Sequence, residues 1–466
     1  MFLKQVIALT LLIGCFKSVQ AQSVSPVVWA PIVQAQPQPA PTIAGYLGSA
    51  QNDELVAAQL TFMGHLVLAA NLPASVGAPE TTLPGGGYGA LVRMTGDGRS
   101  VHSITRVASS LQHAAWAADG SAVACGPDGI TVLEPDFVTV RWHKSIGAIS
   151  RCSIASNGQI AALRPSDNKL LLYSPTGSAV VTITISGTAA ADVVIDSSLG
   201  LVFVAGYTQA ASDLKVPFLR AHSTSNGNLV WQLYNFTAAA VKAAGLGADS
   251  TGNRLALGAD GKLYFAGFTD GGNSVFSRDP MNLSRQLTSS ELIKFDEYNN
   301  PFNISGAKSL AWYARFEPSN GALLLSQWLL SRASNGTGNS ISIEGLAAAA
   351  DGTLIVVGQT YCCIQGRSNM QLFGQTLGNY EAGEPFILLV KPDFSQRLLW
   401  TALAAPGATA GSSPAIAASI SHDRVAAAVT LSPNSTNSRA LVITGNPSSA
   451  TRIGGKDGYY LLMPRP

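Results

Sequence analysis

The residues best placed to do chemistry in this 466-residue chain are two adjacent cysteines after a tyrosine: Tyr361, Cys362 and Cys363. Adjacent cysteines close a small disulfide ring only across a strained or cis-like peptide bond, and such a ring would form a rigid, apolar platform for stacking a ligand. Two further cysteines, Cys125 and Cys152, could bridge each other or pair with Cys362 and Cys363, or the thiols could be free. We expect a ligand to contact Tyr361, Cys362 and Cys363, and the pairing among the four cysteines stays open.

The sequence motifs of common enzyme classes are missing. There is no Gly-x-Ser-x-Gly elbow, no His-Glu-x-x-His, no phosphate loop and no Asp-rich calcium loop. The six histidines are scattered singly, and none has metal-site spacing with a cysteine. We therefore predict no catalytic residue, no metal and no cofactor, and we favour a protein that is not an enzyme.

The N-terminal residues predict export. A basic start at 1–4 precedes an apolar run at 6–14 that is too short to span a bilayer, and small residues lead to a cleavage site after Ala21. We therefore expect residues 1–21 to be a signal peptide and the mature protein to be secreted or in the cell envelope. As an alternative, the four residues ending at Cys15 resemble a bacterial lipobox, which would make Cys15 a lipid anchor. No later apolar stretch is long enough to cross a membrane.

The composition argues against nucleic-acid binding. Charged residues make up 12% of the chain, about half the usual share, and the net charge is +2 without a basic block. A nucleic-acid partner would require a basic patch to neutralise its phosphates. An even number of cysteines in the mature chain suits disulfide formation in an oxidising compartment.

An internal repeat decides the fold. A short strand, a turn residue and a five-residue apolar strand recur seven times. The turn residues, or anchors, are Gly64, Gly120, Gly158, Gly200, Gly261, Gly352 and Asp423. Unbroken apolarity is typical of a strand that is covered on both faces, as the middle strands of propeller blades are. Small or apolar residues six positions before each anchor mark the innermost strand, and the anchor glycine allows the positive φ of a tight hairpin.

A second hairpin and an outer strand follow in most repeats. The hairpins at 90–98 and 218–227 lead into further strands, and outer strands start near 228 and 397. Four strands in each of seven units predict an all-β, seven-bladed β-propeller over residues 42–466.

The ends of the chain predict how the ring closes. The last unit has no outer strand of its own, whereas an orphan strand at 42–48 precedes the first unit. We predict that this N-terminal strand completes the C-terminal blade, which would remove an exposed sheet edge. Residues 22–41, rich in Pro and Gln, are expected to form an extended lead-in.

Several of these repeats resemble a known family. The stretch from Tyr46 to Asp53 resembles the start of the bacterial SBBP-type β-propeller repeat, and 260–269 and 196–208 resemble its latter half, with 351–360 a weaker match. The resemblance covers three units well and extends weakly over the others. It implies an exported propeller and implies no enzyme activity.

Two tryptophans have a spacing found in another class of propeller. The stretches 221–231 and 390–400 end in Trp231 and Trp400 and resemble the tryptophan-docking motif of quinoprotein propellers, in which the indole packs between blades. Ser and Asn replace the usual Asp and Thr of that motif. The catalytic Asp and the calcium ligands of a quinone-dependent dehydrogenase cannot be identified.

Insertions between the predicted strands suggest where binding occurs. They mostly follow the second strand of a blade, at 71–87, 270–308, 359–384 and 432–457, with a shorter one at 208–216. Such loops emerge on one face of a propeller, where repeat proteins usually bind their partners.

The leading functional prediction is a non-enzymatic, exported, monomeric propeller that acts as a binding or scaffold module for a protein or glycan partner. Alternatives are a quinoprotein-like oxidoreductase, a polysaccharide-active propeller and an envelope-assembly lipoprotein. An enzyme is expected to line its central funnel with clustered carboxylates, His or Arg, and ionisable groups converging there would argue against a scaffold. A scaffold is expected to carry aromatic and small polar residues on its rim.

Overall fold

A computed structural model of the chain describes residues 41–287, 292–294, 309–332, 338–361, 363–379, 383–407, 412–432 and 440–466. The predicted signal peptide and nearly all of the lead-in lie outside these residues. The chain divides into two units, Met1–Pro39 and Ala40–Pro466, and the second unit contains every described helix and strand.

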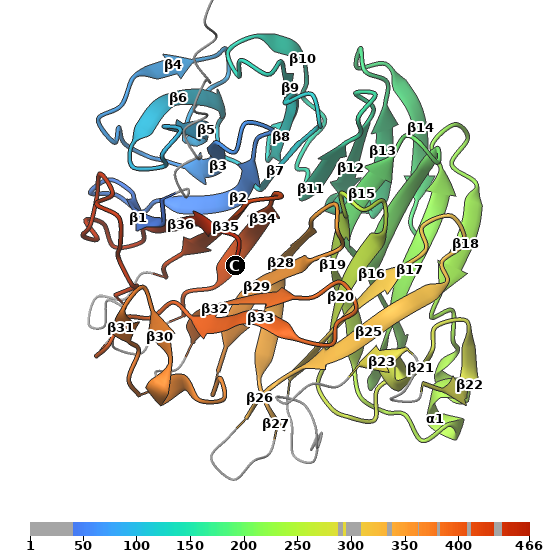
Figure 1. Cartoon of the computed structure of the whole chain (residues 1–466). Coiled ribbons are helices and arrows are strands. Elements are labelled where there is room, and N and C mark those ends of the chain that lie inside the picture. Colours follow the sequence, from blue (N-terminus) through green and yellow to red (C-terminus); the bar gives the residue numbers. More distant parts are fainter. Residues whose placement is uncertain are drawn as a thin grey trace, which may run out of the picture. The chain divides into compact units, whose positions relative to one another are not determined.

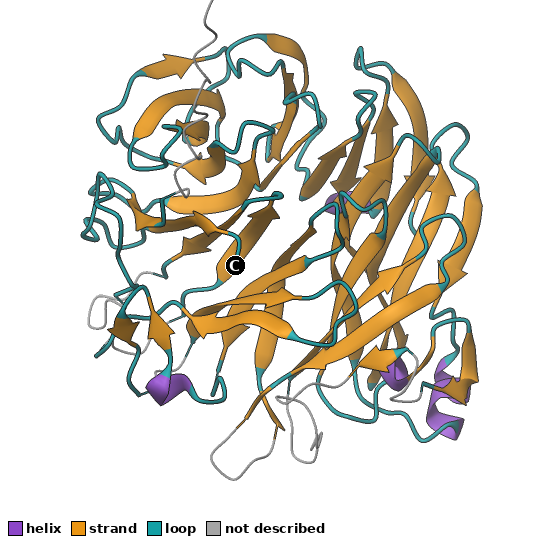
Figure 2. Ribbon diagram, in the orientation of Figure 1, coloured by secondary structure: helices purple, strands orange, loops and turns teal. Residues whose placement is uncertain are grey.

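Seven sheets, each with an inner strand, form a closed ring, and very little helix is present (Figures 1 and 2). The inner strands are β2 (Glu54–Leu60), β7 (His113–Trp116), β11 (Arg151–Ile154), β15 (Ala189–Asp196), β19 (Ser250–Leu257), β28 (Ile341–Ala348) and β34 (Ala415–Ile420). Each inner strand packs against the next one in sequence, and β34 packs against β2. The predicted seven-bladed β-propeller is therefore confirmed.

The second strands are buried along nearly their whole length because a neighbouring blade covers each face. They are β3 (Leu66–Asn71), β8 (Ala122–Gly126), β12 (Ile160–Arg164), β16 (Leu201–Ala211), β20 (Leu263–Thr269), β29 (Leu354–Thr360) and β35 (Arg424–Thr430). The six glycine anchors have φ between +64° and +89°, as their hairpins require, whereas Asp423 forms its turn without positive φ.

The third strands pair with the second strands. They are β5 (Gly89–Met94), β9 (Gly129–Leu133), β13 (Lys169–Tyr173), β17 (Leu214–Ser223), β24 (Leu310–Phe316), β32 (Glu384–Val390) and β36 (Gly458–Pro464). The first six blades then add an outer strand, namely β6 (Val101–Ala108), β10 (Val140–Lys144), β14 (Ala179–Thr184), β18 (Leu229–Leu233), β25 (Leu323–Leu329) and β33 (Arg397–Ala402).

The outer strand of the seventh blade comes from the N-terminal side, as predicted. Strand β1 (Ile43–Leu47) pairs antiparallel with β36, from Ile43 opposite Leu462 to Leu47 opposite Gly458. Figure 1 shows the blue β1 beside β36 in the red part of the chain. All five residues of β1 are buried, so both ends of the unit share one core.

Alternation of strand direction gives the ring two different faces. Hairpins such as those around Gly64 and Gly120 form the turn face. The loop face holds the connections from β3 to β5, β20 to β24, β29 to β32 and β35 to β36, together with the links between blades. The described parts of the predicted insertions thus lie on one face, and residues 208–216 do so as the extended tip of the β16–β17 hairpin rather than as a separate loop.

Short elements decorate the loop face. Strands β4 (Glu80–Thr82) and β23 (Ile293–Lys294) run parallel to β6 and β25 and add a fifth strand to two blades. The remaining small elements are helix α1 (Ala238–Ala243) and the strand pairs β21 (Arg278–Asp279) with β22 (Asn282–Gln286), β26 (Ser331–Arg332) with β27 (Gly338–Asn339), and β30 (Gln371–Leu372) with β31 (Gln375–Thr376).

Candidate functional site

The inner strands of all seven blades enclose a central cavity of about 510 Å³. Alanines from six blades supply much of the lining, including Ala57, Ala114, Ala155, Ala256, Ala347 and Ala417. Small side chains leave space along the axis that larger ones would fill. The cavity volume falls within the range of roughly 300–1,000 Å³ that is usual for small-molecule sites.

Ionisable side chains gather at one level of this cavity. The inner-strand residues that pair with the fifth residue after each anchor are Ala57, His113, Arg151, Asp192, Arg254, Gly345 and Ala417. Glu344 lies directly before Gly345, and all eight residues line the cavity. We call His113, Arg151, Asp192, Arg254 and Glu344 the charged layer.

Five blades shift register by one residue at this level, as in a β-bulge, between residues 55 and 57, 190 and 192, 252 and 254, 343 and 345, and 415 and 417. Bulges re-aim side chains and are frequent next to functional sites. On the neighbouring second strands, a Cβ at Gly206 would lie 2.0 Å from the Ala189 carbonyl oxygen, and one at Gly358 would lie 1.9 Å from that of Ser342. The recurring glycine at this point of the repeat thus allows the inner strand to approach.

Three members of the charged layer hold neighbouring blades together. Arg254 donates from Nη2 to the Glu344 carboxylate at 2.8 Å and from Nε to the Glu344 carbonyl oxygen at 2.8 Å. Asp192 accepts hydrogen bonds from the backbone N–H groups of Leu255 and Val193, both at 2.9 Å. These bonds link the fourth, fifth and sixth blades across the inner edge of the ring.

Arg151 differs from the other members of the layer. Its guanidinium lines the cavity and has no hydrogen bond or ion pair with any residue in the described part of the chain. Burial lowers the pKa of Arg151, and Arg254 acts in the same direction, whereas Asp192 and Glu344 raise it. An arginine stays protonated in proteins, so the cavity contains a positive charge with all five N–H donors unused.

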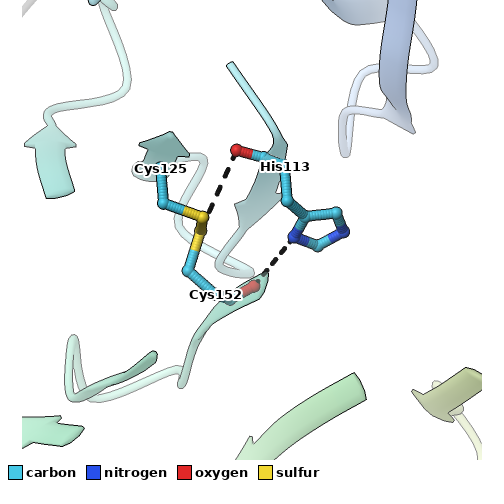
Figure 3. A group of neighbouring side chains, drawn as sticks. All are labelled: His113, Cys125 and Cys152. Atoms are coloured by element: carbon cyan, nitrogen blue, oxygen red, sulfur yellow. Dashed lines mark hydrogen bonds between the residues drawn. A yellow bond between two sulfur atoms is a disulfide. The ribbon is translucent and has the colours of Figure 1, made fainter. Parts of the chain in front are cut away.

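His113 contacts the one disulfide among the described cysteine pairs (Figure 3). Cys125 of β8 and Cys152 of β11 are bonded, with 6.3 Å between their Cα atoms, so the disulfide joins two blades and realises one of the predicted pairings. The His113 Nδ1 lies 3.0 Å from the Cys152 carbonyl oxygen. Because a carbonyl only accepts, Nδ1 carries the proton and Nε2 is the free acceptor of the neutral ring.

Burial lowers the pKa of His113 well below its usual value, and the charges of Arg151 and Arg254 lower it further. The ring is therefore neutral at pH 7. Its nitrogen and the two sulfurs lie within 4.8 Å of one another, a proximity that the sequence spacing does not reveal. Disulfide sulfurs are not thiolates, so this trio offers a metal no cysteine ligand in its oxidised form.

Acidification below pH 6.5 is expected to destabilise the folded propeller through His113. The folded-state pKa lies below the unfolded value of 6.5, so the unfolded chain binds more protons as the pH falls. Stability that is present above pH 6.5 is then lost, by at most about 1.4 kcal/mol per pH unit. Urea unfolding of the wild type and of His113→Gln between pH 7.5 and 5 measures the effect, since the amide can still donate to Cys152. The unfolding free energy of His113→Gln is expected to fall less steeply with decreasing pH than that of the wild type. The control His422→Gln, at a surface histidine, should have the same pH dependence as the wild type. Equal pH dependence in all three proteins would contradict a role of His113 in the loss of stability.

The predicted cysteine site lies on the loop face and is not part of the cavity lining. Tyr361 is 49% exposed and donates from its hydroxyl to Gln359 at 3.2 Å. Cys363 exchanges two backbone hydrogen bonds of 3.0 Å with Arg332 and takes part in a disulfide. Because Cys125 and Cys152 are bonded to each other, the partner of Cys363 lies outside the described residues. Cys362 also lies outside them, so the vicinal ring and its ligand role stay predictions.

The loop face carries exposed apolar side chains in each of its four long connections. Tyr88, Met281, Tyr361 and Ile453 are all about half exposed or more. The connection after Tyr361 is held by a buried ion pair between Arg367 and Glu384, with 2.6 Å between Nη2 and Oε1. Exposed apolar groups on braced loops are typical of binding surfaces.

The tryptophan motif gives a mixed outcome. Trp231 packs between blades as expected: its indole N–H donates to the Pro318 carbonyl oxygen at 3.0 Å, and its ring covers Gly321 of the next blade. Trp142, which the motif does not include, makes the same contact with Pro175 at 2.8 Å. Trp400 packs edge-on against Phe386 within its own blade, and a further contact of Trp400 involves residues outside the described ones.

The sequence analysis did not identify the charged layer, although part of the signal was present. His113, Arg151 and Arg254 each come directly before the small or apolar residue that marks an inner strand six positions ahead of its anchor. Asp192 and Glu344 lie eight positions ahead of theirs. Glu344 is the extra residue of a bulge, and Asp192 is displaced because its hairpin turn is one residue shorter than in the neighbouring blades; no local pattern reveals either change. The central funnel thus contains the ionisable groups expected of an enzyme, and the loop face contains the aromatic groups expected of a scaffold.

Comparison with known proteins establishes the fold and no more. No protein-family model matches the chain, and no curated protein matches it. Among solved structures it is similar to U3-55K, with a TM-score of 0.51 and 10% identity over 92% of this chain and 99% of that one. It is also similar to the RRP9 WD40 repeats, with a TM-score of 0.48 and 10% identity over 91% of this chain and 100% of that one. A third similar structure is Kuenenia stuttgartiensis hydrazine synthase, with a TM-score of 0.46 and 10% identity over 86% of this chain and 97% of that one. In the described part of the chain no helix is long and apolar enough to cross a membrane. At this identity the similarity to U3-55K is one of architecture, and the chain is a seven-bladed β-propeller.

Proposed function

We propose that the chain is an exported, non-enzymatic binding module that presents its loop face to a protein or glycan partner. The observation that carries this proposal is the shared position of the four long connections. All four leave between the second and third strands of a blade, so they converge on one face, and each has an exposed apolar side chain. The turn face is built mainly from short hairpins, one of which exposes Phe62 and Met63.

The charged layer favours binding over acid–base catalysis. His113 donates to a carbonyl, Asp192 accepts two backbone N–H groups, and Arg254 and Glu344 neutralise each other. Proton transfer requires a group that is free to reach the substrate and has a suitable pKa. These four groups instead fasten blade to blade, which is a structural use of charge.

Site-specific photo-crosslinking tests the loop face. A crosslinkable amino acid at Tyr88 or Tyr361 is expected to trap a partner when the protein is expressed in its own cell envelope. The same amino acid at Phe62 or Leu199, exposed in hairpins of the turn face, is expected to trap none. A protease-sensitive adduct identifies a protein partner, and a glycosidase-sensitive one identifies a glycan. Adducts from the turn face alone, or none from either loop-face position, would refute the proposal.

Export is tested separately by mass spectrometry of the mature protein. A chain that starts at Gln22 supports cleavage after Ala21, and acylation at Cys15 supports the lipoprotein alternative. A chain that retains residues 1–21 would contradict export by either route.

A further inference from the structure

The central cavity contains one cation that the protein does not pair. Arg254 is neutralised by Glu344, whereas Arg151 has no ion-pair or hydrogen-bond partner among the described residues. No acceptor among the described residues satisfies this guanidinium, and its nitrogens are not among the fully buried unpaired atoms, so they stay open to the cavity, where a ligand can reach them. Arginine stays charged, because it cannot lose its proton in a protein. A bound anion would supply the missing acceptors.

The charges around Arg151 restrict which anion fits. With His113 neutral, the charged layer holds two positive charges, Arg151 and Arg254, and two negative ones, Asp192 and Glu344. The net charge of this layer is therefore zero before any ligand binds, and Asp196, which also lines the cavity and accepts hydrogen bonds from Ser198, makes the lining as a whole net negative. A dianion such as phosphate would be repelled by both carboxylates at short range, where Coulomb energies in a cavity are large. A single carboxylate can pair with the planar guanidinium through two parallel hydrogen bonds while adding only one charge.

The remaining cavity wall indicates what the anion is attached to. Away from the charged layer the wall combines the apolar side chains of Ile154, Leu257, Leu346 and Ile420 and the alanines named above with polar ones such as Ser153 and Ser419. The volume of about 510 Å³ exceeds what a carboxylate alone would fill. Burying an apolar body against such a wall is favourable at about 25 cal/mol per Å² of area removed from water. The neutral His113 ring adds a hydrogen-bond acceptor at the same level as Arg151.

We propose that the central cavity binds a small monocarboxylate with an apolar body, its carboxylate paired with Arg151 and the body lying along the alanine-rich inner strands. This site is separate from the loop face. Failure of either proposal therefore leaves the other standing, because loop-face crosslinking does not involve Arg151 and cavity binding does not involve Tyr88 or Tyr361.

Titration calorimetry and thermal melting of the full mature protein test this proposal with named probes. Benzoate and hexanoate are expected to bind and raise the melting temperature. Acetate, which lacks the apolar body, and the uncharged benzamide are each expected to bind at least about tenfold more weakly than benzoate, as the loss of a charge-assisted bond or of apolar burial implies. Inorganic phosphate is expected to bind more weakly than benzoate.

Arg151→Gln is expected to lower benzoate affinity at least about tenfold, and Arg151→Lys, which keeps the charge but not the planar fork, should retain part of it. The matched control is Arg141→Gln: Arg141 lies on the outer strand β10, paired with Glu134 at 2.7 Å, and benzoate affinity should not change. Arg151→Gln should also raise the melting temperature of the ligand-free protein, because it removes a charge that has no hydrogen-bond or ion-pair partner among the described residues; a purely structural arginine would lower it. The proposal would be overturned by any of four results for benzoate. These are undetectable binding, binding equal to that of benzamide, binding weaker than that of phosphate, or binding that Arg151→Gln does not change.

Discussion

Deleting Ile43–Leu47 is expected to leave the chain unable to form a stable ring. The five residues pair with β36 along their whole length, and all of them are buried. Tyr46 also accepts a hydrogen bond from the Leu441 backbone N–H at 2.9 Å and packs edge-on against Tyr459 at 5.7 Å. Truncating one large buried side chain costs about 2–5 kcal/mol, so losing several together approaches the total stability of about 5–15 kcal/mol of a typical protein.

A peptide rescue makes the closure prediction specific. The deleted protein should show low soluble yield and rapid proteolysis, and a synthetic peptide of residues 41–49 added during refolding should restore protease resistance by supplying the missing strand. The control peptide carries Gly45→Val. A Cβ at Gly45 would lie 2.3 Å from the side chain of Pro447, so this peptide should not rescue. A deletion variant that melts cooperatively at the wild-type temperature without peptide would contradict the closure mechanism.

The second large effect is expected from Arg367→Ala on the loop face. Arg367 and Glu384 are 3% and 0% exposed, and the guanidinium binds both carboxylate oxygens and the Gly378 carbonyl oxygen at 2.9 Å. Removing the arginine leaves a buried carboxylate without its counter-charge, which costs about 3–5 kcal/mol. Denaturant unfolding should show a lower midpoint, and limited proteolysis should cleave first near residues 363–379.

Two controls separate burial from charge in this experiment. Lys242→Ala breaks an exposed ion pair with Asp213 and should change the unfolding free energy by less than about 1 kcal/mol. The double variant Arg367→Met, Glu384→Leu removes both charges and should recover a large part of the lost stability, because neither partner is left alone. An Arg367→Ala midpoint equal to that of Lys242→Ala would show that the pair contributes no more than a surface contact.

The parts of this structure that sequence predicts are those governed by local physics. An apolar run after a glycine turn specifies a covered strand whatever surrounds it, so seven such runs were enough for the blade count. Closure was also predictable, because a missing strand at one end matched an orphan strand at the other. Trp231 followed the same logic, since its motif encodes a turn and an outer strand together.

The unpredicted parts depend on residues that meet only in three dimensions. Arg367 and Glu384 lie on either side of a connection, and nothing near either one indicates that the other neutralises it. Glu344 reaches the cavity as the extra residue of a bulge, and Asp192 lies one position further from its anchor because its hairpin turn is one residue shorter than in the neighbouring blades. Trp400 packs against Phe386 of its own blade much as Trp231 packs against Phe203, a contact between side chains that the spacing of the motif does not specify.

The pairing of β1 with β36 also imposes an order of events in time. The strand that closes the ring is synthesised first, and its partner, near Gly458–Pro464, is synthesised last. At roughly 5–20 residues per second, the chain between these two strands takes about 20 to 80 seconds to be synthesised. During that interval β1 has no partner and its apolar residues are unprotected. A cell that makes this protein therefore has to keep β1 from pairing with other strands until β36 has been synthesised.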